Sequence, residues 1–359
     1  MNPNYSTDNN AVQYLIGKDS VGQSAKYFTA YPSVYILIDE NTEKFCLPIL
    51  QKNLPNLKVR GYIKVPSGES EKTLERASFI WKKLTNLDAG RDSLLINLGG
   101  GVITDMGGFC AGTFKRGIDF INIPTTLLAQ VDAAIGGKTG INFNSIKNQI
   151  GLFYDPKAVI VDPVFLNTLD EKYWQSGFAE ILKYALIMDR ELWKMLNMRK
   201  YSEIDDWNKI IERSAKDKID IVRYDKMEKG IRKNLNFGHT VGLAFESLFL
   251  KSGKSITHGR AIAAGMICEA WISSRMTELE CINVDEIIKM IDNNFERLSV
   301  SEKNINELME IMRQDKKIRD GLFRFSLLRR MGKAVHDIVV EPELVEQSLR
   351  FYIDNKNCK

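Results

Sequence analysis

Apolar and polar stretches alternate through the first half of this 359-residue chain. Leu74, Ile80 and Leu84 recur at the spacing of one helix face, which predicts a helix over residues 71–87. Short apolar runs predict buried strands over residues 34–38, 58–65, 94–98, 120–123 and 159–161. Strands that alternate with helices form parallel sheets, and such sheets bind ligands at the carboxyl ends of their strands.

The pattern changes after Asp162-Pro163, where long amphipathic segments replace the short apolar runs. These segments predict helices over residues 179–198, 203–224, 240–250 and 261–277. Two apolar runs at residues 322–328 and 334–340 predict a β-hairpin near the end. The sequence therefore predicts the α/β class, with a Rossmann-like parallel-sheet domain over residues 1–162 and a mostly α-helical domain over residues 163–359.

Composition and charge narrow the function classes. A chain of 359 residues is too long for one ordinary core and suits two domains. Its 50 Lys and Arg residues against 46 Asp and Glu residues leave a net charge of +4, which is too balanced for a general nucleic-acid binder. We expect no export signal and no membrane span, because no basic region precedes an apolar one and no apolar run is long enough. The five cysteines show no paired spacing, so we expect them to be reduced, in a cytoplasmic protein.

Glycine is concentrated in one segment, since eleven of the 25 glycines fall between Gly99 and Gly151. The segment begins where the strand over residues 94–98 ends, and we expect Thr104 to cap the helix that follows. Glycines let the backbone approach a ligand closely, and free N–H groups attract anions. This strand–turn–helix unit predicts a nucleotide site, although the strict G-x-G-x-x-G fingerprint is not met, because Thr104 stands where the last glycine would be.

The second half carries the candidate metal ligands. The chain has three histidines, and two of them, His239 and His258, each stand beside a glycine. A catalytic zinc site takes three protein ligands and leaves one position open, and imidazole is the commonest of these ligands. Glu180 is the candidate third ligand, because an unpaired carboxylate in an apolar helix would be costly. From spacing alone, a capped helix with two ordinary histidines fits equally well, and we expect His336 to be structural or exposed.

Several short blocks, in one order along the chain, resemble those of a known family. They are Gly99–Asp105, Lys115–Gly117, Pro124–Asp132, Gly136–Gly140, Lys147-Asn148, Ala179–Lys183, Leu235–His239, His258-Gly259 and Asp315–Lys317. From about Val34 to beyond Lys317 the chain resembles the 3-dehydroquinate synthase family, the sugar-phosphate cyclases of the shikimate pathway. The resemblance implies NAD, a divalent metal ion (Zn²⁺ or Co²⁺), and conversion of 3-deoxy-D-arabino-heptulosonate 7-phosphate into 3-dehydroquinate with loss of phosphate. It also implies that the first domain binds NAD and that the second binds metal and substrate.

The resemblance assigns individual residues to these sites. Those that match the NAD site are Asp39, Asn41, Glu69, Lys72, Gly100, Gly101, Asp105, Thr125, Thr126, Asp132, Lys138, Lys147 and Thr168. Those that match the metal site are Glu180, His239 and His258. Those that match the substrate pocket are Asp132, Lys138, Asn148, Lys183, Lys218, Arg232, Asn236 and Lys316.

The resemblance also implies which group of the substrate each of these residues contacts. Lys218 and Arg232 suit the carboxylate, and Lys138 and Asn148 suit the phosphate. Arg116 would reach the phosphate held by a neighbouring subunit, which implies a homodimer.

Two positions depart from the family's pattern. The family usually reads Gly-His-Thr-x-Gly-His, and here Leu243 replaces the second histidine. Leucine neither donates nor accepts a proton, so we expect turnover to be weakened, although the phosphate of the substrate could itself take the proton. Arg260 stands where an acidic residue is common.

Three other functions stay open on the sequence. Another sugar-phosphate cyclase is disfavoured by Lys218, Arg232 and Asn236, which suit a carboxylate. A metal-dependent polyol dehydrogenase would need no phosphate-binding residues such as Lys138, Lys147 and Asn148. A non-catalytic protein that binds NAD and metal is compatible with Leu243.

Overall fold

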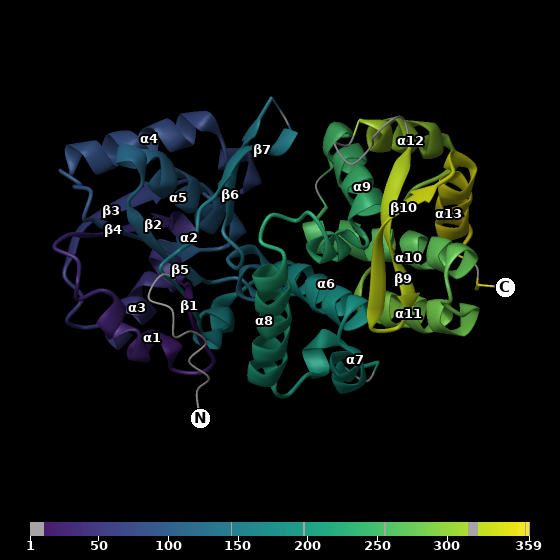
Figure 1. Cartoon of the computed structure of the whole chain (residues 1–359), viewed down its shortest axis with the longest axis horizontal. Coiled ribbons are helices and arrows are strands. Elements are labelled where there is room, and N and C mark those ends of the chain that lie inside the picture. Colours follow the sequence, from purple (N-terminus) through teal and green to yellow (C-terminus); the bar gives the residue numbers. More distant parts are fainter. Residues whose placement is uncertain are drawn as a thin grey trace. The chain divides into compact units, whose positions relative to one another are not determined.

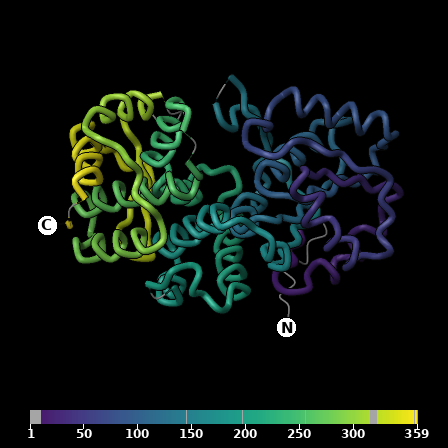
Figure 2. The backbone as a smooth tube through the Cα atoms, turned by 180° about the vertical axis from the view of Figure 1, so that it is seen from behind, coloured from purple at the N-terminus to yellow at the C-terminus, as the bar shows by residue number. Residues whose placement is uncertain are grey.

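The computed structural model describes residues 11–358, apart from positions 145, 197, 255, 315–321 and 356. The chain divides into two compact units. The first contains the residues up to Asp170 together with Trp207–Ile219, and the second contains Glu171–Asp206 and the residues from Asp220 onward. Figures 1 and 2 draw the chain from opposite sides, with colours that follow the sequence from purple at the N-terminus to yellow at the C-terminus.

The first unit is built on a six-stranded sheet in the order β1-β8-β5-β4-β2-β3, and every neighbouring pair is parallel. Its strands are β1 (Gln13–Ile16), β2 (Val34–Asp39), β3 (Val59–Val65), β4 (Leu94–Gly99), β5 (Asp119–Pro124) and β8 (Ala158–Val161). Gly99 and Pro124, the last residues of β4 and β5, are register partners. The predicted α/β class with a parallel sheet is confirmed.

The central strands are buried on both faces by helices. Tyr35 of β2 belongs to an apolar cluster with α4 and α5, whereas its neighbour Ile36 belongs to a cluster with α1 and α3. Because successive side chains point to opposite faces, a strand covered on both sides reads as an unbroken apolar run. The helices of this unit are α1 (Ser20–Gln23), α2 (Glu40–Phe45), α3 (Leu47–Asn53), α4 (Leu74–Asn86), α5 (Gly101–Thr113) and the first part of α8 (Trp207–Tyr224).

The glycine-rich segment differs from the expectation in two ways. Helix α5 begins at Gly101, with Gly100 at its N-cap, and Thr104 lies inside the helix, where its hydroxyl donates to the Gly101 carbonyl. The predicted cap at Thr104 is therefore wrong, because the glycine turn itself opens the helix. The sequence also did not reveal the antiparallel hairpin of β6 (Lys138–Phe143) and β7 (Ile146–Phe153).

The second unit is mostly helical, with one antiparallel hairpin, β9 (Phe323–Arg330) and β10 (Lys333–Val340), as predicted. Its helices are α6 (Glu171–Ile187), α7 (Arg190–Leu196), α9 (His239–Lys251), α10 (His258–Met276), α11 (Cys281–Asn294), α12 (Ile305–Arg313) and α13 (Pro342–Asp354). The predicted helix over residues 179–198 is two helices, because Asp189 accepts the Leu192 N–H and starts α7 anew.

Short helical turns connect these elements. They are the 3₁₀ helices η1 (Ala25–Tyr27), η2 (Glu69–Glu71), η3 (Phe114–Arg116), η5 (Pro163–Thr168), η6 (Tyr201–Glu203), η7 (Ile231–Asn236) and η8 (Glu302–Asn304), and the π-helical turn η4 (Ala129–Ala133).

The cysteines differ from the expectation. Cys281 and Cys358 form a disulfide, with their Cα atoms 5.1 Å apart, so the expectation that all five cysteines are reduced is wrong for this pair. The spacing of 77 residues hid the pairing.

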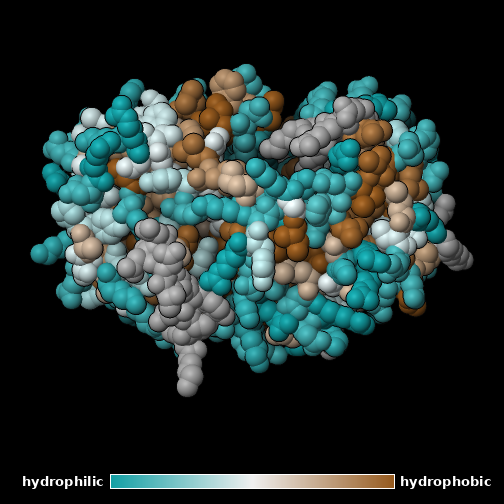
Figure 3. Space-filling model, viewed as in Figure 1, coloured by the Kyte–Doolittle hydropathy of each residue, from teal (hydrophilic) through white to brown (hydrophobic). Residues whose placement is uncertain are grey.

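Hydrophilic residues cover most of the face drawn in Figure 3. Among the helices of the described residues, none is both long and apolar enough to cross a membrane.

Candidate active site

The end of strand β2 carries the first of the predicted cofactor residues. Asp39 is the N-cap of α2, and its carboxylate accepts the Thr42 N–H at 2.8 Å while the Thr42 hydroxyl accepts the Asp39 N–H at 2.9 Å. Burial raises the pKa of Asp39, against the opposing effect of its hydrogen bonds with Thr42. Asn41, two residues further on in the first turn of α2, is exposed. An acidic residue at a strand end is placed to accept hydrogen bonds from a ribose.

The adjacent strand ends form a turn with little side-chain bulk. Gly100 and Gly101 open α5, and Thr125 donates its N–H to the Gly99 carbonyl of β4. A Cβ atom on Gly100 would lie 2.9 Å from the Thr126 side chain, so the turn admits only glycine without rearrangement. A helix that begins with bare backbone N–H groups at the carboxyl edge of a parallel sheet fits the pyrophosphate of a dinucleotide.

A buried cation lies next to this turn. Lys72 is almost fully buried, and its ammonium is 2.5 Å from Asp105 of α5 and also contacts Asn148 of β7. Burial raises the pKa of Asp105, and Lys72 acts in the opposite direction. Glu69 accepts a hydrogen bond from Asn142 of β6 at 2.9 Å. The structure thus brings four predicted residues, Glu69, Lys72, Asp105 and Asn148, to one place in the first unit.

The other predicted residues of the first unit lie on turns and on the hairpin. The ammonium of Lys218, on α8, is 2.6 Å from the carboxylate of Asp132 in η4. Lys138 and Lys147 are exposed on the β6–β7 hairpin. Arg116 is exposed at the end of η3 with a positive φ of 69°, and Thr168 is exposed at the end of η5. Lys316 lies outside the described residues.

The second unit brings the three predicted metal ligands together. Nε2 of His239 and Nε2 of His258 are each 3.6 Å from Oε1 of Glu180. One ligand atom from each residue lies within 4.8 Å of the others. Metal–ligand bonds of about 2.0–2.2 Å in a tetrahedral site place ligand atoms about 3.4 Å apart, so this spacing suits an ion such as Zn²⁺. Two imidazoles and one carboxylate are also a donor set of catalytic zinc sites.

Close helix packing explains how these ligands meet. Helices α9 and α10 begin with His239 and His258 respectively. A Cβ on Gly265 of α10 would lie 2.0 Å from the Gly238 carbonyl, and a Cβ on Gly259 would lie 2.4 Å from the backbone of Ser176 in α6. The glycines therefore let α10 approach both α9 and α6, the helix that carries Glu180.

The charges of this cluster are strongly coupled. Burial alone would lower the pKa of His258, but hydrogen bonds with Glu180 and Glu246 outweigh it and raise the pKa to about 9. Glu180 and Lys183 are both buried and contact one another across one turn of α6. Two imidazoles that face one buried carboxylate can give up their protons and bind a divalent cation in their place.

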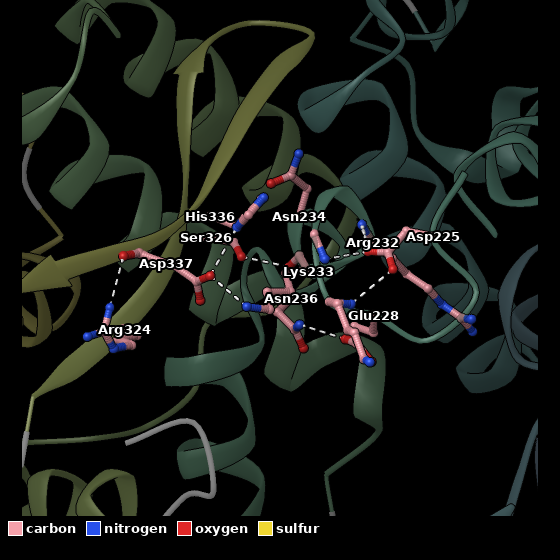
Figure 4. Close-up of polar contacts among 12 residues, drawn as sticks. Asp225, Glu228, Arg232, Lys233, Asn234, Asn236, Arg324, Ser326, His336 and Asp337 are labelled. Carbon is pink, nitrogen blue, oxygen red and sulfur yellow. Dashed lines mark hydrogen bonds and ion pairs between the residues drawn. The ribbon is translucent and has the colours of Figure 1, made fainter. Parts of the chain in front are cut away.

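The predicted residues Arg232 and Asn236 lie on η7 (Figure 4). Arg232 is buried and donates from Nη1 to the Lys226 carbonyl at 2.5 Å, while its backbone N–H donates to Asp225 at 3.1 Å. Asn236 donates to Glu228 at 2.9 Å. The hairpin holds η7 in place, because Ser326 of β9 donates to the Lys233 carbonyl at 2.7 Å. His336 of β10 is half-buried beside Asp337.

Sequence reasoning did not name Glu228, Glu246 or Glu269. Glu246 follows His239 by seven residues, two helical turns on one face, and contacts His258. Glu269 is an acidic residue in a stretch that is otherwise apolar from residue 261 to 272, and this signal could have identified it.

The two departures from the family's pattern both lie near this cluster. Leu243 is half-buried four residues after His239, which puts both on one face of α9. Arg260 forms an ion pair with Glu296, with its Nη2 2.7 Å from the carboxylate.

Comparisons with known proteins show which families the chain resembles. The model of the 3-dehydroquinate synthase N-terminal family matches residues 62–176, and that of the 3-dehydroquinate synthase C-terminal family matches residues 177–318. The chain is 41% identical over 327 residues to a 3-dehydroquinate synthase of Parabacteroides distasonis, covering 90% of this chain and 92% of that one. It is 35% identical over 333 residues to that of Thermoanaerobacter pseudethanolicus, covering 91% and 93%.

Solved structures share the fold at lower identity. A 2-deoxy-scyllo-inosose synthase complexed with carbaglucose-6-phosphate, NAD⁺ and Co²⁺ is 22% identical with a TM-score of 0.85, and the match covers 98% of this chain and 99% of that one. A 2-epi-5-epi-valiolone synthase from Streptomyces hygroscopicus, with NAD⁺ and Zn²⁺ bound, is 23% identical with a TM-score of 0.84 and the same coverage. The matches of both family models and of the close relatives, over most of the chain, show that it belongs to the 3-dehydroquinate synthase family.

Proposed function

We propose that this chain is a 3-dehydroquinate synthase, a lyase that converts 3-deoxy-D-arabino-heptulosonate 7-phosphate into 3-dehydroquinate and phosphate. The observation that carries the proposal is the convergence of Glu180, His239 and His258, whose ligand atoms lie within 4.8 Å of one another, in a chain of this family. Two cyclases of the same fold were solved with NAD⁺ and with Co²⁺ or Zn²⁺, which supports both cofactors.

We assign one cofactor to each unit. The glycine turn at Gly100 and Gly101, together with Asp39 and Lys72, would hold NAD in the first unit. Glu180, His239 and His258 would hold Zn²⁺ or Co²⁺ in the second. When bound, the metal ion polarises a hydroxyl of the substrate and NAD takes up and returns a hydride, so NAD is not consumed.

The chain's own residues would bind and orient an acid with several negative charges. Arg232 is buried and presents a planar guanidinium, which suits a carboxylate, and we assign Lys218 to the same group. Lys138 and Asn148, both on the β6–β7 hairpin, are assigned to the phosphate. Lys183, Asn236, Asp132 and Lys316 complete the proposed set.

We also propose a homodimer in which Arg116 reaches the phosphate of the neighbouring subunit. Support comes from the turn Lys115-Arg116-Gly117, where all three residues have positive φ. This conformation costs free energy for residues with a side chain, and it leaves Arg116 exposed. Mass measurement in solution tests the dimer. A mixture of Arg116→Ala chains with chains inactivated at Glu180 tests the sharing of residues, because only mixed dimers would contain one complete site.

The test of the activity is phosphate release from the heptulosonate phosphate with NAD and Zn²⁺ present. Catalytic amounts of NAD should suffice, and no NADH should accumulate. Stoichiometric NADH would instead indicate a polyol dehydrogenase. A sugar phosphate that lacks the carboxylate should not be turned over, and turnover of it alone would indicate another cyclase.

Leu243 favours one second candidate, a paralogue that binds NAD and metal but turns over weakly or not at all. Normal binding of NAD and metal without phosphate release would support that function.

A further inference from the structure

Helices α9 and α10, which begin with the candidate histidines, each carry a carboxylate that contacts the other helix. Glu246 lies on α9, two turns after His239, and its Oε2 is 3.3 Å from Nδ1 of His258 at the start of α10. Glu269 lies on α10, and its carboxylate accepts hydrogen bonds from the backbone at the start of α9. Each helix thus carries one histidine and one carboxylate that contacts the start of the other helix.

The contact with Glu246 fixes how His258 presents its ring. An imidazole has two nitrogens, and the partner of one decides which nitrogen carries the lone pair. Nδ1 of His258 faces Glu246, so Nε2, 3.6 Å from Glu180, is the free ligand atom. His239 shows the same orientation, with Nδ1 3.2 Å from the Phe237 carbonyl and Nε2 3.6 Å from Glu180.

Glu269 acts on the backbone that carries His239. Gly238 is the N-cap of α9 and has no side chain with which to cap it. Oε2 of Glu269 accepts the Gly238 N–H at 2.6 Å, and Oε1 accepts the Val241 N–H at 3.1 Å. These two residues flank His239, so the fully buried Glu269 fixes the first turn of α9 from both sides of the ligand. A buried carboxylate at a helix N-terminus is stabilised by the free N–H groups there.

We propose that Glu246 and Glu269 are positioning residues of the metal site, which hold His258 and His239 in the geometry that sets metal affinity. The inference deepens the proposed function and rests on it, since it requires that Glu180, His239 and His258 bind a metal ion. Outer carboxylates of this kind orient a ligating ring and raise its basicity, and their loss costs about 10–100-fold in metal affinity. Because each carboxylate lies on the helix opposite to the ring it orients, the site would respond to any shift of α9 along α10.

The first test measures metal affinity of the metal-free full chain and its variants by competition with a chromophoric chelator. Glu246→Ala should bind Zn²⁺ about 10–100-fold more weakly and alter the visible absorption spectrum of bound Co²⁺, which reports coordination geometry. Glu246→Gln should lose less affinity, because its amide oxygen can still accept from Nδ1. Glu286→Ala, which removes an exposed carboxylate of α11, is the matched control and should behave as wild type.

The second test separates positioning from a purely structural role. Glu269→Gln keeps the shape of the side chain but turns one acceptor into a donor that faces an N–H group. We expect about 10-fold weaker Zn²⁺ binding together with a changed Co²⁺ spectrum. A lower melting temperature of the metal-free protein with unchanged affinity and spectrum would mean that Glu269 is only a helix cap.

The outcomes distinguish failure of the positioning role from failure of the proposed function. If the wild type binds no metal, the proposed function fails at that point. If the wild type binds metal and Glu246→Ala retains its affinity and Co²⁺ spectrum, the positioning role is overturned while the proposed function stands. Should Glu269→Gln fail to fold, the Glu246 variants decide the proposal.

Discussion

The two units arrange their buried charges differently. In the first unit the polar residues pair with opposite charges, as Lys72 does with Asp105 at 2.5 Å and Lys218 with Asp132 at 2.6 Å. In the second unit, groups that can bind a cation crowd together, with two imidazole nitrogens 3.6 Å from the carboxylate of Glu180.

The difference shows what each unit requires from its ligand. In the first unit the paired charges compensate one another within the protein. A ligand must replace these contacts with new ones, so its net binding affinity is modest. In the second unit Glu180 also contacts an ammonium, that of Lys183, but two imidazoles face the same carboxylate. A metal ion bound there would displace the proton of His258, whose pKa is raised to about 9, and would stabilise the folded state by mass action. We therefore expect the second unit to depend on its ligand more than the first.

The largest effect should come from Glu180→Ala, which removes the carboxylate that both histidines face. Because loss of an outer carboxylate already costs about 10–100-fold, loss of a ligand should weaken metal binding by more than about 100-fold and abolish turnover. NAD binding by the first unit should persist. Metal analysis after dialysis and titration with NADH fluorescence measure the two. Glu191→Ala, an exposed carboxylate on α7, is the control, and full metal content in Glu180→Ala would disprove the ligand assignment.

A smaller effect, in the opposite direction, is expected from Leu243→His. The residue lies four positions after His239 on one face of α9 and is half-buried. A placed acid–base group contributes about 10²–10⁴-fold, so turnover should rise by some part of that factor, while the KM of the substrate changes less. Steady-state phosphate release at saturating NAD and Zn²⁺ measures it.

The control for this substitution is Leu250→His, at the exposed end of the same helix. Metal content must be equal in all proteins, because a new imidazole could bind a second ion. Equal turnover of Leu243→His and wild type would mean that proton transfer does not depend on this position.

Most strands could be predicted from apolar runs, the partly exposed strand β3 included, but β1 and the β6–β7 hairpin could not. Strands β2, β4 and β5 are covered on both faces and read as apolar runs, whereas the four-residue edge strand β1 and the exposed β6–β7 hairpin have no such pattern. The start of α5 was misplaced for a different reason. Its N-cap is Gly100, which carries no capping side chain that a sequence pattern could reveal.

The residues of the candidate site also fall into those that a local sequence pattern predicts and those that it does not. Glu180 could be identified because a carboxylate in an apolar helix demands a partner, and the same reasoning applies to Glu269. The contacts of Lys72 with Asp105, 33 residues away, and with Asn148, 76 residues away, depend on how the sheet and hairpin meet, which no local pattern encodes.

The smallest effect should follow Lys72→Met, which tests whether the charges of the first unit stabilise one another. Removing the ammonium leaves Asp105 without its cation, and an uncompensated buried acceptor costs about 1–3 kcal/mol of folding free energy. NAD affinity should also fall, because Asp105 would bind less well in its protonated form. Lys82→Met, which removes an exposed ammonium from α4, should have little effect on stability.

The pH dependence gives this variant a specific signature. Burial already raises the pKa of Asp105, and Lys72 opposes that rise, so the pKa should rise further in Lys72→Met. The folded variant then binds a proton more readily than the unfolded chain, and its stability increases as pH falls through the raised pKa. The melting temperature of the variant should lie furthest below that of the wild type at neutral pH and approach it at an acidic pH below the raised pKa. A deficit that is equal at both values would show that Lys72 contributes packing alone, and that the first unit does not rely on paired charges.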